Sequence, residues 1–467
     1  MINFNDDTII ALATPNGAGA IATIRISGKD AINIVSKVFS VPKGNPFKES
    51  APAKLRLGNI TNGNEIIDEV LAVLYKAPHS YTGENMVEIS CHGSQYIIHS
   101  ILTLLINNGC RTAFPGEFTQ RAFLNGKMDL SQAEAVADLI ASNSASAHRV
   151  AFNQMRGGFS NKLSELRAEL LDFVSLIELE LDFSEEDVEF ADRTKLTQLI
   201  THISATINTL IKSFNAGNAI KNGIPVAIVG ETNAGKSTLL NLLLNDEKAI
   251  VSDIHGTTRD VIEDSITING VLFRFIDTAG IRDTQDTIET IGIERTFKKI
   301  EEANIVLWLV DVNSQEEHIT ELATKLLPLT KDKKLILIFN KIDAVNEQQT
   351  QQKQHLLETE IPERIFISAK NHTNTPELEK LLVQAANIPE IGSQDVIVTN
   401  LRHYEVLKKA NEAIERVQTG LIQNLPTDLL VQDIRECMQY LGEITGDGLI
   451  STDEILNNIF GRFCIGK

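Results

Sequence analysis

The chain has 467 residues, of which 43% are hydrophobic and 22% are charged, and its formal net charge is −19. This length suggests about three domains, and the composition is that of an ordinary globular protein. No apolar run approaches the roughly 20 residues that a membrane span needs. The net negative charge excludes a general electrostatic attraction to nucleic acid, so an RNA substrate must meet a local basic patch or a second protein.

The amino-terminal residues Met1 to Asp7 are acidic rather than basic, so we do not expect a secretory signal. The four cysteines are too far apart in sequence to indicate a zinc knuckle or a redox pair. They are Cys91, Cys110, Cys437 and Cys464. A reducing cytoplasmic location, without a membrane partner, fits this usage. We interpret the first three cysteines as structural thiols.

Residues 1 to about 120 are expected to form a mixed α/β domain. The β-rich runs Thr8–Ala11 and Ile21–Ile24 flank a Pro-Asn-Gly turn, which indicates a hairpin or a strand–loop–strand unit. A further strand is expected at Glu69–Tyr75.

From about Asp129 to Phe214, apolar residues recur at spacings of three to four, which predicts helices. Ser131 and Glu134 have the spacing of a capping box at the start of the first helix. The segment Ala216–Gly223 is interpreted as a looser stretch that breaks the helical pattern.

From Pro225 to about Leu382 the pattern alternates between strands and helices. The expected strands are short β-branched runs, typical of a parallel sheet buried on both faces. They are Val226–Val229, Ile305–Val310, Leu335–Phe339 and Ile365–Ile367. An Asn-Gly pair at 269–270 predicts a hairpin and hence one antiparallel edge.

The helical pattern returns after about residue 388. We therefore expect a multidomain α/β and all-α protein, in which an α/β domain with a mostly parallel sheet is inserted into a helical domain. The expected segments are 1–120, 121–222, 223–384 and 385–467, the second and fourth forming the helical domain. Three domains in a row are the alternative.

The motif Gly230–Ser237 reads G-x-x-x-x-G-K-S and lies between an expected strand and an expected helix. In this context the glycines let backbone N–H groups surround phosphates, and the helix N-terminus adds partial positive charge. Lys236 is expected to bind β- and γ-phosphate oxygens and to assist catalysis, and Ser237 to ligate Mg²⁺. A chance glycine-rich turn is the alternative.

Further elements follow in the order found in a GTPase. Asp277–Gly280 is expected to reach Mg²⁺ and the γ-phosphate, and Thr258 to supply the second hydroxyl on Mg²⁺. Asp343 can accept hydrogen bonds from guanine N1–H and N2–H₂, a donor pair that adenine lacks. The expected nucleotide-binding residues are Gly230, Asn233, Ala234, Gly235, Lys236, Ser237, Thr238, Ser252, Asp253, Ile254, His255, Gly256, Thr257, Thr258, Asp277, Thr278, Ala279, Gly280, Asn340, Lys341, Asp343, Ser368, Ala369 and Lys370.

The catalytic group departs from the pattern in which a glutamine orients the attacking water, because Ile281 follows Gly280. Glu289, twelve residues beyond Asp277, is a candidate for that role, although a solvated surface glutamate is the more ordinary interpretation from position alone. Arg259 and Arg282 are not assigned as arginine fingers.

These motifs, with further segments outside them, carry a resemblance to a known family. The segments are DTIIALATPNGAGAIATIRISG (residues 7–28), SYTGENMVEISCHG (80–93), PGEFTQRAFLNGKMDLSQAEAVADLI (115–140), IGIER (291–295) and the terminal FCIGK (463–467). The whole chain resembles the MnmE/TrmE family of tRNA uridine-modification GTPases.

The resemblance implies that GTP hydrolysis is stimulated when two G domains dimerise around K⁺, a cation that offsets developing negative charge. The residues that match the family's K⁺-binding positions are Asn233, Ser252, Ile254 and Thr257. Glu289 matches the family's water-orienting glutamate, so the resemblance makes it a catalytic residue.

The resemblance also implies an amino-terminal domain that forms a homodimer and binds 5-formyltetrahydrofolate or a related tetrahydrofolate. Arg25, Glu88 and Lys127 match the family's folate contacts, and Lys467 completes the pocket. Cys464 matches the cysteine of the terminal C-I-G-K motif; a catalytic thiol and a structural thiol are both open interpretations.

The implied reaction is joint. With an FAD-containing partner, MnmG (GidA), in a heterotetramer or larger assembly, the protein forms a carboxymethylaminomethyl- or aminomethyl-uridine at the tRNA wobble position from a tetrahydrofolate one-carbon unit. The alternatives are a ribosome-assembly, RNA-associated GTPase and a non-catalytic nucleotide-binding scaffold.

Overall fold

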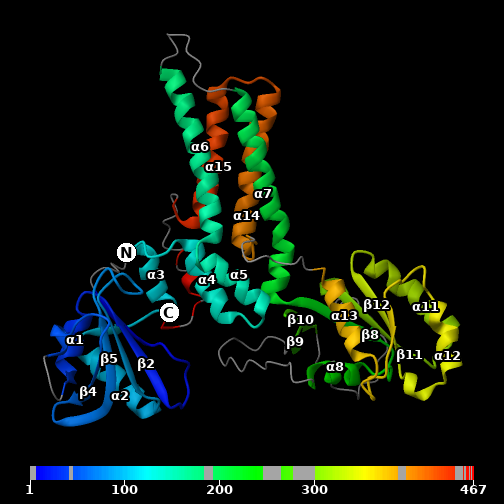
Figure 1. Ribbon diagram of the computed structural model, residues 1–467, viewed down its shortest axis with the longest axis horizontal. Coiled ribbons are helices and arrows are strands. Elements are labelled where there is room, and N and C mark those ends of the chain that lie inside the picture. Colours follow the sequence, from blue (N-terminus) through cyan, green and yellow to red (C-terminus); the bar gives the residue numbers. More distant parts are fainter. Residues whose placement is uncertain are drawn as a thin grey trace. The chain divides into compact units, whose positions relative to one another are not determined.

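The computed structural model describes residues 7–41, 46–182, 193–245, 264–276, 300–387, 396–447, 456, 459–461, 463 and 465–466. The chain divides into two compact units. The first comprises Met1–Ala137, Gln154–Ile203 and Lys409–Lys467, and the second comprises Asp138–Asn153 and Ser204–Lys408. Both units combine sheets with helices, which confirms the expected mixture of α/β and helical parts (Figure 1).

The first unit contains, in its described part, a seven-stranded sheet in the order β3-β4-β5-β6-β2-β1-β7. Its strands are β1 (Thr8–Leu12), β2 (Ile21–Ser27), β3 (Phe39–Ser40), β4 (Leu55–Asn62), β5 (Glu65–Tyr75), β6 (Met86–His92) and β7 (Cys110–Thr112). Strands β1 and β2 pair antiparallel, which confirms the expected hairpin, and β5 contains the expected strand at residues 69–75. Strand β7 runs parallel to β1 at the edge.

Alternation along the strands decides which side chains are buried. Ile24 and Ile26 of β2 enter a core that also contains Ile34 of α1 (Ala31–Val38) and Ile101 of α2 (Gln95–Asn107). Because side chains alternate between the two faces of a strand, Arg25 lies on the opposite face. That face carries the polar groups discussed below.

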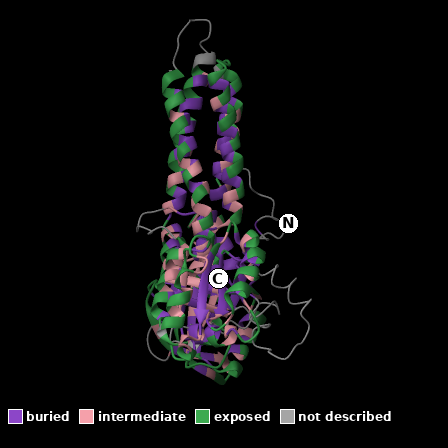
Figure 2. Cartoon of the chain, turned by 90° about the vertical axis from the view of Figure 1, so that its right-hand side faces the viewer, coloured by how far each residue is buried: buried purple, intermediate pink, exposed green. Residues whose placement is uncertain are grey.

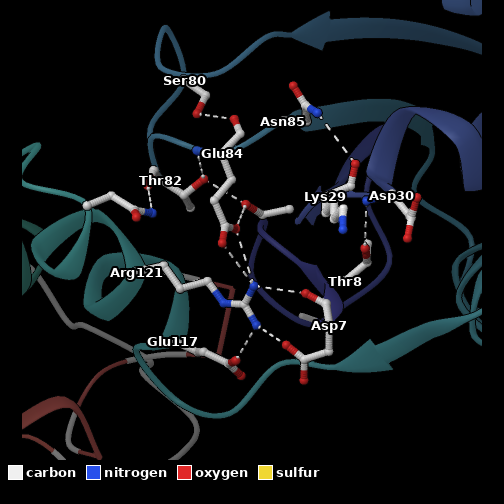
Figure 3. Close-up of polar contacts among 12 residues, drawn as sticks. Asp7, Thr8, Lys29, Asp30, Ser80, Thr82, Glu84, Asn85, Glu117 and Arg121 are labelled. Carbon is white, nitrogen blue, oxygen red and sulfur yellow. Dashed lines mark hydrogen bonds and ion pairs between the residues drawn. The ribbon is translucent and has the colours of Figure 1, made fainter. Parts of the chain in front are cut away.

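A buried charge network joins three segments of this unit (Figure 3). Arg121 of α3 (Glu117–Leu124) is 2% exposed and donates to the carboxylates of Asp7, at 2.5 Å, and Glu117, at 2.9 Å. It also pairs with Glu84 at 3.2 Å. Arg111 donates to Asp7 and Glu117 in turn. Two guanidinium groups thus face three carboxylates, so each charged group of this network has an opposite charge beside it, although Arg121 Nε itself makes no hydrogen bond.

Helices follow this sheet as expected from residue 129 onward. They are α4 (Leu130–Ala141), α5 (Ala145–Met155), α6 (Gly158–Asp182), α7 (Arg193–Asn222), α14 (Leu401–Ile422) and α15 (Thr427–Thr445). Within the first unit α6 packs against α15. Buried and exposed residues occupy different faces of the long helices (Figure 2), as their apolar periodicity predicts.

The expected capping box at Ser131 and Glu134 is wrong by two residues. The helix α4 begins at Leu130, and Asp129 Oδ1 accepts from the Gln132 backbone N–H at 2.9 Å. Gln132 Oε1 accepts from the Asp129 backbone N–H in return, also at 2.9 Å. Ser131 is buried instead and bonds to Ser160 of α6.

The expected break at Ala216–Gly223 is also wrong, because α7 continues to Asn222. Gly217 lies inside it, and a Cβ there would come within 2.1 Å of the Val398 carbonyl oxygen. The glycine therefore permits a close approach of two backbones rather than ending the helix. The Val398 backbone N–H also donates to Ser213 Oγ at 3.0 Å.

The second unit contains, among its described residues, a six-stranded sheet in the order β13-β12-β11-β8-β10-β9. Its strands are β8 (Ile224–Gly230), β9 (Asp264–Ile268), β10 (Val271–Phe275), β11 (Ile305–Asp311), β12 (Lys334–Asn340) and β13 (Arg364–Phe366). All neighbours pair parallel except β9 with β10, which confirms the mostly parallel sheet and its antiparallel edge. Asn269 and Gly270 form the connecting turn with φ of 50° and 82°.

Both faces of this sheet are covered by hydrophobic cores. The helices of this region are α8 (Lys236–Asn245), α11 (Glu316–Leu326), α12 (Glu347–Gln352) and α13 (Thr375–Ala386). Residues of α8 and α13 join one core, and residues of α11 join the other. In the described part of the chain, no helix has the length and apolar content needed to cross a bilayer.

The charge network yields a stability prediction. Arg121→Met keeps a similar volume but leaves the fully buried Glu117 carboxylate with one cation fewer, so we expect a loss of about 3–5 kcal/mol in the stability of the first unit. Hydrogen exchange of the β2 and β6 amides in the full chain measures it. Lys162→Met, which breaks the exposed pair with Glu165, is the control and should change exchange by less than about 0.5 kcal/mol. Similar exchange in the two variants would contradict a role for the network.

Candidate functional site

The sheet of the second unit changes its strand order at β8. Strand β8 lies between β11 and β10, so the chain order reverses direction at this strand. In open α/β sheets, ligands bind outside the carboxyl ends of strands at such a point. The phosphate motif begins there, because β8 ends at Gly230 and α8 begins at Lys236.

Two glycines of the motif are required by close packing. A Cβ on Gly230 would lie 2.1 Å from the Leu309 carbonyl oxygen, and one on Gly235 would lie 2.3 Å from Asn340 Nδ2. Both residues also have positive φ, as does Asn233 at 64°. The loop therefore takes the tight, left-handed turns that direct successive backbone N–H groups toward an anion.

Lys236 turns back over this loop. Its ammonium group donates to the carbonyl oxygens of Gly230 and Glu231, each at 2.7 Å. A cation is thus held at the opening of the loop, next to the N-terminus of α8. Ser237 follows in the first turn of α8, and a hydroxyl is the kind of oxygen ligand that Mg²⁺ takes in phosphate sites.

Asn340 connects the phosphate loop with the far side of the site. It is 2% exposed, its Nδ2 donates to the Ala234 carbonyl at 2.9 Å, and its Oδ1 accepts from the Ala369 backbone N–H at 3.0 Å. The side chain of this expected nucleotide-binding residue therefore holds two loops together. Its sequence position predicted a contact with the nucleotide but did not show this bridging role.

Asp343 and Ser368, both expected to bind the nucleotide, contact each other. The Ser368 hydroxyl donates to Asp343 Oδ1 at 2.5 Å and accepts from the Asn371 backbone N–H at 3.2 Å. The carboxylate is thereby oriented before any base arrives. This is the arrangement needed for an acceptor that must face two N–H donors on one edge of a base.

Asp311 is a site residue that sequence reasoning missed. It ends β11 opposite Asn340, and its Oδ2 accepts from Lys341 Nζ at 2.8 Å. Burial acts to raise the pKa of Asp311, but hydrogen bonds from Lys341 and Asn313 outweigh it and hold the pKa below its ordinary value. An aspartate at the carboxyl end of a parallel strand was the available signal.

Several expected site residues lie outside the described residues. They are Ser252, Asp253, Ile254, His255, Gly256, Thr257, Thr258, Asp277, Thr278, Ala279, Gly280, Glu289, Cys464 and Lys467. Their roles stay predictions.

The first unit contains a second polar site on the sheet face opposite its core. Arg25 Nε donates to Glu88 Oε1 at 2.9 Å, and the guanidinium lies 5.2 Å from the centre of the Tyr81 ring and 5.8 Å from that of Phe118. The same guanidinium donates to the Gly466 carbonyl at 3.4 Å. The structure therefore brings together Arg25, Glu88 and the described residue Gly466 of the terminal motif, while the two aromatic rings were missed.

Lys127 lies beside the loop that carries Tyr81. Its Nζ donates to the Pro78 carbonyl at 3.0 Å, and its side chain passes close to Gly83. Burial raises the pKa of Tyr81, although the Thr119 hydroxyl and Arg25 act against that rise. Cations, a carboxylate and aromatic rings are the groups that suit a ligand with carboxylates and a polar heterocycle.

The interpretation of three cysteines as structural thiols is confirmed. Cys91, Cys110 and Cys437 are buried, and burial raises the pKa of Cys91 to about 11 and those of the other two to about 12. These thiols are therefore protonated at neutral pH and poor nucleophiles.

Comparisons with known proteins extend beyond the nucleotide motifs. A family model described as the GTP-binding protein TrmE N-terminus matches residues 8–127, and one described as the MnmE helical domain matches residues 130–464. Among curated relatives, the tRNA modification GTPase MnmE of Bacteroides thetaiotaomicron is 59% identical over 99% of this chain and 100% of that protein. The protein of the same name from Flavobacterium psychrophilum is 55% identical over 99% of each chain.

Among solved structures, Era from Aquifex aeolicus bound to GDP and AlF₄⁻ is 27% identical, covering 40% of this chain and 66% of that one, with a TM-score of 0.28. The amino-terminal family match lies wholly before the phosphate motif, and the identity to curated relatives spans the full length. The chain belongs to the MnmE/TrmE family of tRNA modification GTPases.

Proposed function

We propose that this chain hydrolyses GTP to GDP and phosphate as part of the modification of the wobble uridine of tRNA. The observation that carries the GTPase proposal is the Asn340 side chain, which joins the phosphate loop to the loop bearing Ser368. One buried amide thus couples the phosphate end of the site to its base end. Family membership supports the tRNA part of the proposal.

Guanine selection follows from the orientation of Asp343. A carboxylate held by Ser368 accepts hydrogen bonds from both guanine N–H donors. Adenine presents no such pair, so an adenine nucleotide would leave a desolvated carboxylate unpaired, and that costs more than a neutral contact gains.

Lys236 supplies the phosphate contact. On nucleotide binding, its ammonium exchanges the carbonyls of Gly230 and Glu231 for phosphate oxygens. The residues proposed for Mg²⁺ are Ser237 and Thr258, and those proposed for K⁺ are Asn233, Ser252, Ile254 and Thr257. When bound, these cations would offset negative charge on the phosphates. Glu289 orients the attacking water, since Ile281 has no polar group for it.

The wider reaction rests on the second site. In this proposal Arg25 and Lys127 would bind the carboxylates of a tetrahydrofolate, Glu88 would accept from the N–H donors of its pterin, and Lys467 would complete the pocket; the contact between Arg25 and Glu88 supports it. The 1–120 segment would then serve as folate-binding and dimerisation domain, beside a helical domain (121–222 and 385–467) and a G domain (223–384).

We further propose that the homodimer works with the FAD-containing partner MnmG, which transfers the one-carbon unit to the uridine. The net charge of −19 supports a division of labour in which the partner carries much of the tRNA-binding surface. Cys464, near the terminal lysine in sequence, is a candidate nucleophile in that step.

Asp343→Asn tests the base site. The amide cannot accept from both guanine donors, so we expect GTP affinity to fall by about 10- to 100-fold, the scale of losing one or two hydrogen bonds to a charged group. Xanthosine triphosphate, which has an oxygen where guanine has its amino group, should bind better to the variant. Calorimetry measures both affinities, with the exposed Asp332→Asn as the matched control. Unchanged selectivity would refute the assignment.

Glu289→Ala tests the catalytic assignment. We expect GTP binding to be unchanged and hydrolysis to slow by about 10²-fold, the effect of losing one positioned catalytic group. Turnover measured in K⁺ and in Na⁺ should be faster in K⁺ for the wild type; equal rates would remove the cation from the proposal. In a deletion strain, nucleoside analysis of tRNA should show loss of the modified uridine, restored by the wild type and not by the variant.

Lys127→Met tests the folate site. Its ammonium bonds only an exposed loop carbonyl among described atoms, so the fold should tolerate the change. Loss of one charge-assisted contact should weaken 5-formyltetrahydrofolate binding about tenfold. Binding is measured by calorimetry, and Lys37→Met on α1 is the control, since Lys37 is exposed and lies on another element. Equal binding by both variants would contradict this site.

A further inference from the structure

The phosphate loop has a side-chain contact that the family motif does not specify. Glu231, the residue directly after Gly230, forms a hydrogen bond and ion pair with His318 Nε2. His318 lies in the first turn of α11, 87 residues away in sequence. Both side chains are about half exposed, 46% for His318 and 45% for Glu231. The contact therefore ties the loop to a helix that carries none of the expected nucleotide-binding residues.

The backbone of Glu231 makes this contact relevant to the site. Its carbonyl oxygen is one of the two that hold the Lys236 ammonium, at 2.7 Å. Glu231, whose side chain is held by α11, therefore also helps to fix the position of the Lys236 ammonium group. If the side chain were released, the carbonyl would lose one of the restraints on its position.

The charge of Glu231 also bears on the ligand. Its carboxylate belongs to the loop proposed to surround the phosphates, so its negative charge opposes the binding of an anion there. The imidazolium form of His318 cancels this charge. Among the described residues, the other charged groups that act on His318 are Glu321 and Lys325 of the same helix, which pair with each other.

We propose that His318 is a positioning residue for nucleotide binding, which as an imidazolium holds the Glu231 segment of the phosphate loop and neutralises its carboxylate. This inference rests on the proposed function, because it assigns a role toward the nucleotide of the same site. It adds a residue from α11 to that site.

The inference makes nucleotide affinity depend on pH in a stated direction. The hydrogen bond from Glu231, and then its charge, raise the pKa of His318 above 6.5. The stabilising contact is therefore fully present below about pH 6.5 and is lost as the pH rises through the raised pKa. GTP binding should weaken over the same interval.

The test is calorimetry of the full-length protein with a non-hydrolysable GTP analogue and Mg²⁺ between pH 6 and 8.5. His318→Gln keeps a hydrogen-bonding side chain without the charge. We expect it to bind about two- to fivefold more weakly than the wild type at pH 6.5, the range of an exposed ion pair, and this difference should shrink as the pH rises toward 8.5. Because the wild type and His318→Gln are measured with the same nucleotide, titration of the nucleotide does not change the ratio of their affinities.

Two further variants make the result specific. In a Glu231→Gln background there is no charge to cancel, so His318→Gln should have no effect on affinity at either pH. His355→Gln breaks a similar exposed pair, that of His355 with Glu358, on a segment without an expected nucleotide contact, and should match the wild type throughout. The thermal unfolding temperature should be the same in all variants. A purely structural role of the His318–Glu231 pair would instead lower the unfolding temperature of His318→Gln.

The outcomes separate this inference from the function on which it rests. Wild-type protein that binds the analogue, together with His318→Gln showing the same affinity and pH profile, overturns the role of His318 alone. An equal loss in the Glu231→Gln background does the same. Wild-type protein that does not bind the analogue at any pH overturns the proposed function, and this inference with it.

Discussion

A polar group removed from water must find hydrogen-bond partners, and this constraint determines how both units are assembled. In the second unit it acts on Asn340, whose amide is satisfied from both ends by backbone groups of two different loops. In the first unit it acts on Arg121, whose guanidinium gathers carboxylates from three segments. In each case one buried side chain aligns segments that are more than 25 residues apart.

The two cases differ in what they leave available for a ligand. The Asn340 amide is used up in joining the loops, so the groups that remain for a nucleotide are the loop N–H groups, Lys236 and Asp343. The Arg121 network likewise satisfies its own charges and fixes α3, whose Phe118 ring lies against Arg25. A support of paired charges thus lies behind the polar site proposed around Arg25.

Features with a strong local signal were predictable from the sequence. The β-branched runs at β8, β11 and β12 are typical of buried strands, and the Asn269–Gly270 pair is typical of the tight hairpin turn that it forms. The phosphate motif was recognisable because its glycines and lysine have no common structural substitute in that order. The contacts that its residues make with one another, such as the bond from Asn340 to the Ala234 carbonyl, were not predicted.

Features set by contacts distant in sequence were not predictable. Gly217 looks like a helix breaker until Val398 is known to lie against it, and Ser131 looks like a cap until Ser160 is found beside it. The contacts of Tyr81 with Arg25 and of His318 with Glu231 join segments far apart in sequence, so only the folded chain reveals them. Local sequence patterns predict the conformational preference of a residue. The conformations and contacts of these residues are instead determined by partners that are distant in sequence.

The close approach at Gly217 has a consequence for the path of the chain. Segment 396–400 returns to α7 beside the point where the chain leaves it for β8, so the intervening residues enter and exit at neighbouring places. A module whose two ends lie together can be spliced into a host helix pair, or excised from it, with little disturbance to either. The closeness of the Gly217 and Val398 backbones thus gives residues 223–396 an entry point and an exit point on the same stretch of α7.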